Sequence, residues 1–167
     1  MHPHLPDYDH SLRWQEQWSR CVRWYRKVEA IKQKSFKEEI GADDRDIIFS
    51  FFQNCYHLRD WLSNTRPDIQ KEMEDLFARS PELQACLDIC NGTKHGALDR
   101  PKRDAHFNIY REYDYLVKSD ETGESPVKYR VMFGPDTDIK KWDIFELADG
   151  CARLWNEFLS KRNLLNK

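Results

Sequence analysis

The sequence predicts a mainly α-helical protein, a bundle of four to five helices with a β-hairpin inserted before the last helix. Apolar residues recur every three or four positions through most of the chain, the period of a helix with one buried face. Between residues 105 and 134 the period changes to two, which is typical of β-strands. We expect a single domain over residues 1–167, in which residues 1–9 form a flexible arm and residues 105–134 the hairpin.

Four helices are predicted before residue 100, over residues 9–40, 43–66, 69–77 and 80–96. The second begins with two aspartates, which suit the positive end of a helix dipole, and Pro67 ends it. Its expected core positions are Ile48, Phe51, Phe52, Cys55, Leu58 and Leu62. Short connections between these helices favour a compact bundle.

The hairpin is predicted from two alternating segments, residues 105–118 and 126–133, joined by a polar turn that contains Gly123. Because an isolated hairpin is only marginally stable in water, it should lie on the bundle or pair with the edge of a partner. Asp143 and Glu146 then resemble a capping box, which predicts the start of the last helix.

The composition excludes several classes of protein. A net charge of −2 gives no general excess of positive charge for nucleic acid, although residues 11–40 hold a local excess of Lys and Arg. No apolar run is long enough to span a bilayer, so we expect a cytoplasmic protein without a membrane partner. The five cysteines include no Cys-x-x-Cys pair, and we interpret them as reduced, buried thiols without a metal.

The fourth helix ends in polar groups that can move protons and hold anions. Asn91 and His95 are one helical turn apart, so their side chains are expected to meet. An amide beside an imidazole fixes the tautomer of the ring, which general acid–base catalysis requires. Lys94 lies beside them and is suited to neutralising a phosphate or a carboxylate. These three residues are the first half of a candidate site.

A second polar cluster, His57, Arg59 and Asp60, interrupts the otherwise apolar second helix. If the second and fourth helices are neighbours, we expect His57 or Asp60 to face Asn91 or His95, with Arg59 as a further anion-binding group. The alternative is a structural network that satisfies buried backbone groups and fixes the helix register. The Glu-x-x-His motifs of bundle di-metal proteins are not present, so neither a metal nor another cofactor is expected.

Asn91 and His95 near the end of a core helix resemble the motif of the HEPN superfamily of small helical proteins. Many members are ribonucleases of toxin–antitoxin and phage-defence systems. Their motif is an Arg, commonly a polar residue next and then a His, and the Arg and His of two protomers cleave RNA without metal. Asn91 matches the second position and His95 the last, but Cys90 stands at the arginine position. The resemblance implies either a metal-independent endoribonuclease that uses Arg59 or Lys94 instead, or a degenerate member. The order of elements is also similar to that of small bacterial proteins of unknown function.

We therefore expect a HEPN-like protein, intact or degenerate, that binds or cleaves RNA in a toxin or phage-defence setting. The alternative is a non-enzymatic protein–protein interaction module, whose aromatic, basic first helix and hairpin edge bind another protein or a second copy. A homodimer is expected because large aromatic side chains lie on several helix faces. These side chains are Trp14, Trp18, Trp24, Tyr25, Trp155 and Phe158.

Overall fold

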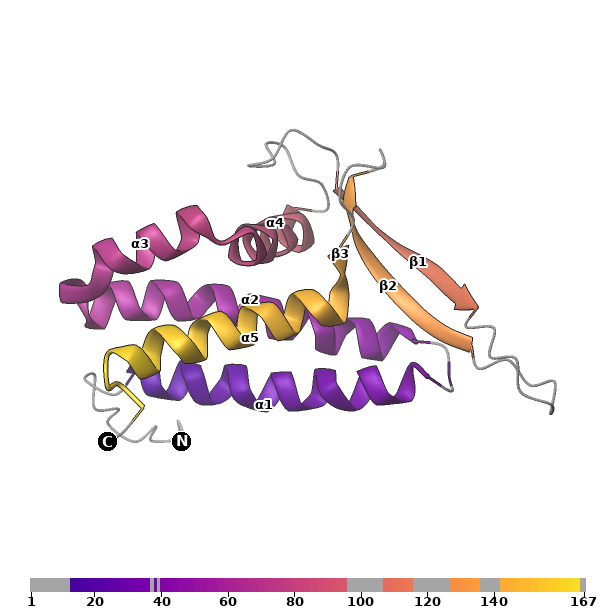
Figure 1. Ribbon diagram of the computed structural model, residues 1–167, viewed down its shortest axis with the longest axis horizontal. Coiled ribbons are helices and arrows are strands. Elements are labelled where there is room, and N and C mark those ends of the chain that lie inside the picture. The colour runs from indigo at the N-terminus through magenta and orange to yellow at the C-terminus, as the bar shows by residue number, and fades with distance from the viewer. Residues whose placement is uncertain are drawn as a thin grey trace, which may run out of the picture.

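The computed structural model describes residues 13–36, 38, 40–95, 107–115, 127–135 and 142–165 (Figure 1). These residues form five α-helices, one short 3-10 helix and three strands, which confirms the predicted mainly helical fold with a hairpin before the last helix. In chain order the elements are α1 (Arg13–Lys34), α2 (Ala42–Thr65), η2 (Pro67–Ile69), α3 (Gln70–Arg79), α4 (Pro81–His95), β1 (Phe107–Tyr115), β2 (Val127–Pro135), β3 (Trp142–Asp143) and α5 (Ile144–Lys161).

The helices pack around one apolar core. Helices α1 and α2 contact each other most extensively, α5 packs against α1, α2 and α4, and α3 and α4 cover α2 from the other side (Figure 1). All six core positions predicted in α2 are buried. Burial of such side chains is the main favourable contribution to folding. The bulkiest fully buried side chains are Trp155, Phe51, Phe52 and Phe145.

Helix α1 ends at Lys34, earlier than the predicted end at residue 40. The Ser35 hydroxyl donates a hydrogen bond to the carbonyl oxygen of Lys32 at 2.6 Å, and the Ser35 amide donates to Ile31 at 2.8 Å. A serine side chain that bonds the backbone in this way competes with continuation of the helix. The hydrophobic period alone could not detect this stop.

The start of α2 is held by a carboxylate in its first turn. Asp44 accepts a hydrogen bond from the Gly41 amide at 3.0 Å and another from the Lys34 ammonium group at 3.0 Å. The first contact satisfies an amide at the N-terminus, where helices have no internal acceptor. The second ties the end of α1 to the beginning of α2. The predicted start at an aspartate is therefore correct to within two residues.

Strands β1 and β2 pair antiparallel, with Tyr115 opposite Val127 at the end of the ladder. The short β3 pairs with the other edge of β2, placing Phe133 opposite Trp142. The hairpin projects from one end of the bundle and is connected to it through β3, directly before α5 (Figure 1). Strand β3 was not predicted, because two residues carry no recognisable period. The carboxylate of Asp143 caps α5 by accepting from the amides of residues 145 and 146, which confirms the predicted helix start.

Candidate functional site

Helix α4 carries one half of the predicted site, and its middle turns are enclosed by the protein. Six consecutive residues, from Ala85 to Cys90, are buried, so all faces of these turns are covered. Asn91, the next residue, is half-buried, and it is the last residue of α4 whose side chain the structure describes. The backbone of Lys94 and His95 continues the helix, whereas their side chains lie outside the described part of the structure. The predicted contact between Asn91 and His95 therefore remains a prediction.

The three residues of the predicted cluster on α2 differ in their exposure to solvent. His57 and Asp60 are exposed, whereas Arg59 is half-buried. The guanidinium carbon of Arg59 lies 5.1 Å from the ring centre of Phe77 on α3, a cation–π contact. The structure therefore separates Arg59 from the other two residues of the cluster and directs it towards α3 and α4.

Arg59 lies close to the first half of α4. It lines a cavity of about 280 Å³ together with Gln84 and Leu87 of α4 and with residues of α3. Gln84 donates hydrogen bonds to the carbonyl oxygens of residues 77 and 78, at 3.0 and 2.7 Å, and so satisfies the end of α3. Asn91 lies one turn beyond Leu87. The structure shows no contact of His57 or Asp60 with Asn91, and both side chains are exposed on α2. The predicted contact with His95 lies outside the described side chains.

The arginine position of the HEPN motif is occupied by a buried thiol. Cys90 is only 8% exposed. A hydrogen bond with Cys86, together with burial, raises the pKa of the Cys90 thiol far above its ordinary value. Cys90 is therefore neutral and cannot replace the positive charge of an arginine. All five cysteines are free and buried, as predicted. Among the described residues no group of three or more His, Cys, Asp or Glu side chains could hold a metal ion.

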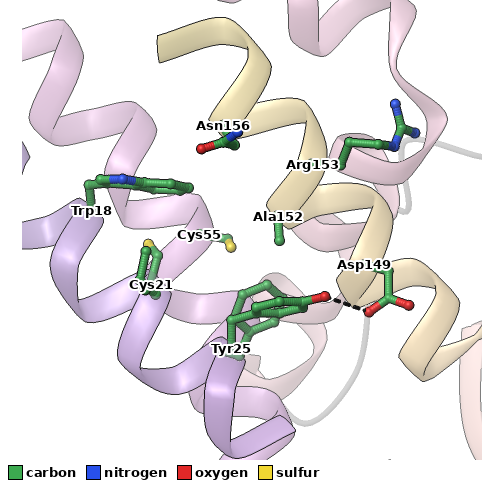
Figure 2. Close-up of a pocket in the computed structure, with 10 residues that line it drawn as sticks. Trp18, Cys21, Tyr25, Cys55, Asp149, Ala152, Arg153 and Asn156 are labelled. Atoms are coloured by element: carbon green, nitrogen blue, oxygen red, sulfur yellow. Dashed lines mark hydrogen bonds between the residues drawn. The ribbon is translucent and has the colours of Figure 1, made fainter. Parts of the chain in front are cut away.

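A larger cavity, which the sequence did not predict, lies between α1, α2 and α5 (Figure 2). Its volume is about 400 Å³. Aromatic, aliphatic and thiol side chains form most of the wall, and charged and amide groups of α5 lie at one side. The lining residues are Trp18, Cys21, Val22, Tyr25, Phe51, Cys55, Asp149, Ala152, Arg153 and Asn156.

Asp149 at the edge of this cavity is held by two residues of α1. Its carboxylate accepts a hydrogen bond from the Tyr25 hydroxyl at 2.8 Å (Figure 2) and one from the Lys32 ammonium group at 2.6 Å. Burial and the hydrogen bond to Asp149 raise the pKa of Tyr25, so its hydroxyl remains protonated and donates. The hydrogen bond with Asp149 also raises the pKa of Lys32. The positive charge of Lys32 therefore neutralises the negative charge of Asp149 at this edge of the cavity.

One signal for this arrangement is present in the sequence. Tyr25 and Lys32 are seven residues apart, so they lie on one face of α1. Their common partner, Asp149, follows more than a hundred residues later, and no local pattern connects them.

The comparisons with known proteins add no relative: no family model matches the chain, nor does any curated protein or solved structure. Of the helices that the structure describes, none is both long and apolar enough to cross a membrane.

Proposed function

We propose that this chain is a degenerate HEPN-like protein that binds RNA at the end of α4 and cleaves it weakly or not at all. The observation that carries the proposal is the change in exposure along α4. Residues 85–90 are all buried, whereas Asn91, the next residue of the motif, is half-buried and so partly accessible to solvent. Polar motif residues at the point where a core helix emerges are placed to meet a ligand, whereas a purely structural network would be sealed.

Weak cleavage is expected because no strong cation occupies the arginine position. Cys90 is neutral, and Arg59 lies against Phe77 at the level of Gln84 and Leu87. At about 1.5 Å per residue, position 95 is about 12 Å further along the helix than position 87. Of the two cations named as replacements for the arginine, Arg59 and Lys94, this leaves Lys94 to stabilise the transition-state charge on a phosphate. An ammonium group provides one point charge, whereas a guanidinium can form two parallel hydrogen bonds.

The experiment measures binding and cleavage of single-stranded RNA separately. Fluorescence anisotropy with a labelled RNA should show salt-sensitive binding that weakens several-fold in Lys94→Ala and His95→Ala. His57→Ala is the matched control, because it removes an exposed histidine from another helix. Any slow cleavage should persist in a chelator and disappear in His95→Ala. Equal binding by all three variants would refute the proposal.

The setting implied by the resemblance is a cytoplasmic toxin or phage-defence system, and we include it in the proposal. The alternative, a protein–protein interaction module, would present a broad exposed apolar patch. Among the described side chains Phe36, at 41% exposed, is the only large hydrophobic one on the surface. One ring is a small anchor for a partner, so the described side chains give this alternative little support.

A further inference from the structure

We propose that the cavity between α1, α2 and α5 binds a small, flat aromatic molecule that carries a carboxylate. This site is separate from the RNA-binding end of α4 and does not depend on that proposal. Its volume of about 400 Å³ lies within the range of roughly 300–1,000 Å³ that is usual for small-molecule sites. Such sites combine a mainly apolar wall with a few polar groups that fix the orientation of the ligand.

The wall of the cavity suits an aromatic ring. Trp18 and Tyr25 of α1 surround the space shown in Figure 2, and Ala152 of α5 lies across it. Aromatic side chains favour edge-to-face or offset contacts with another ring. The small Ala152 side chain leaves room between the two helices.

The deep part of the cavity is apolar and uncharged. It contains the thiols of Cys21 and Cys55, both 1% exposed. Burial and a hydrogen bond with Cys21 raise the pKa of Cys55 well above its ordinary value, so this thiol is neutral. A ring can be buried against neutral thiols without desolvating a charge, whereas a charged group would lose its hydration there. The charged end of the ligand is therefore expected at the edge of the cavity.

The charges at the edge favour an anion over a cation. Both oxygens of Asp149 already accept hydrogen bonds, from Tyr25 and Lys32, and the Lys32 ammonium group neutralises the charge of this carboxylate, which weakens its attraction for a ligand cation. Arg153 also lines the cavity, and its side chain is 57% exposed. Its partner Glu157 is 3.4 Å away in an exposed ion pair, which contributes little to stability. A ligand carboxylate can therefore replace Glu157 as the partner of Arg153.

Asn156 provides the second polar group at this edge. It lies three residues after Arg153, so both side chains are on neighbouring positions of one face of α5. Its amide side chain can donate a hydrogen bond to a carboxylate that Arg153 has attracted. The ring in the cavity and the anion at Arg153 and Asn156 together define the ligand class.

Three probes with the same ring test this proposal by isothermal titration calorimetry: indole-3-acetate, indole and tryptamine, which are anionic, neutral and cationic at neutral pH. We expect indole-3-acetate to bind at least several-fold more tightly than indole, and tryptamine to bind most weakly. Arg153→Gln should remove the preference for the anion, so that indole-3-acetate binds no more tightly than indole. Lys161→Gln is the matched control, because it removes an exposed cation from α5 that does not line the cavity.

Blocking the cavity provides the second test. Ala152→Phe places a ring in the space between α1 and α5 and should abolish binding of all three probes. Circular dichroism and thermal unfolding establish that the variant is folded; if it is not, the smaller Ala152→Leu substitution serves the same purpose. Tryptamine binding as tightly as indole-3-acetate would overturn the proposed charge preference. Undiminished binding by a folded Ala152 variant would overturn the proposed location.

Discussion

Gln17 is a polar residue that the structure uses as part of the core. It is 1% exposed, and its side-chain amide donates to the backbone oxygen of Asn54 at 2.9 Å and to the side-chain oxygen of Asn54 at 3.0 Å. Asn54 in turn donates to the carbonyl oxygen of Ser50 at 2.7 Å. These contacts fix the relative position of α1 and α2, because apolar contacts alone have no direction.

Replacing Gln17 by Ala should lower the free energy of unfolding by about 1–3 kcal/mol, because it leaves the Asn54 oxygen without its donor and removes buried atoms. Gln33→Ala is the control, since this glutamine of the same helix is exposed and should change stability by less than about 0.5 kcal/mol. Urea unfolding followed by circular dichroism measures both changes. Similar effects of the two substitutions would show that the Gln17 contacts do not stabilise the helix pair.

The comparison of Gln17 with the apolar core explains what can be predicted for single residues. The six buried positions of α2 were predicted correctly because their side chains are apolar and recur with the helical period. The burial of Gln17 and of Asp88 could not be predicted in this way. A polar side chain is buried only where the fold supplies a partner, and the partner of Gln17 is 37 positions away.

At the scale of the helices, Gly150 lies where α5 passes close to α4. A Cβ atom at this position would lie 2.9 Å from the Cγ atom of Glu82. The neighbouring Cys151 thiol lies 3.5 Å from the carbonyl oxygen of Glu82 and donates to it. Glycine within a helix costs about 1 kcal/mol relative to alanine. The close packing of the two helices offsets this cost.

We expect Gly150→Ala to bring no gain in stability in the natural sequence, because the Glu82 side chain must move away from the new methyl group. In a Glu82→Ala background the clashing Cγ atom is absent, and the same substitution should stabilise the protein by about 1 kcal/mol. A double-mutant cycle measured by chemical unfolding gives this difference directly. An equal effect of Gly150→Ala in both backgrounds would mean that Glu82 does not limit the approach.

Some boundaries of the helices and strands could be predicted from the sequence, and others could not. The start of α5 was predicted because a capping aspartate directly precedes an apolar period. The end of α1 was predicted too late, because Ser35 stops the helix with its own hydrogen bond to the backbone. Strand β3 depends on pairing with β2, which is a contact between segments that the sequence pattern does not define.

At the scale of the molecule, the geometry of a helix explains why the polar residues predicted on α2 do not all face α4. Successive residues of a helix are about 100° apart, so neighbouring positions such as 57, 58, 59 and 60 must point in different directions. In the structure Leu58 enters the core, Arg59 turns to α3 and α4, and His57 and Asp60 remain exposed. The sequence shows that polar residues cluster, but the rotation of each helix determines which of them face another helix.

The aromatic rings that motivated the predicted homodimer are mostly covered within one chain. Trp14, Trp155 and Phe158 are buried, and Trp18 and Tyr25 line the cavity between α1 and α5. Trp24 is partly buried, and the Lys27 ammonium group lies 4.3 Å from its ring centre. These rings are therefore not a sufficient reason for self-association, and a homodimer would have to use another surface.

The edge of strand β1 is the surface at which we expect a second copy to bind. Within the described residues the sheet has the order β1-β2-β3, so β1 pairs with β2 on one side only. The unpaired backbone groups of an edge strand can extend the sheet by pairing with a second chain. The hairpin projects from the bundle, so its backbone edge can be approached without displacing a helix (Figure 1).

We therefore predict a homodimer in which two copies of β1 pair. Light scattering at micromolar concentration should give twice the chain mass, and hydrogen exchange should show protected amides at alternating positions of β1, because every second residue of an edge strand points its amide outward. Dilution should return the monomer and the protection should disappear with it. A dimeric mass without protection of β1 would place the interface elsewhere. A monomeric mass at all concentrations would exclude the dimer, together with any composite site of the HEPN type that requires two copies of α4.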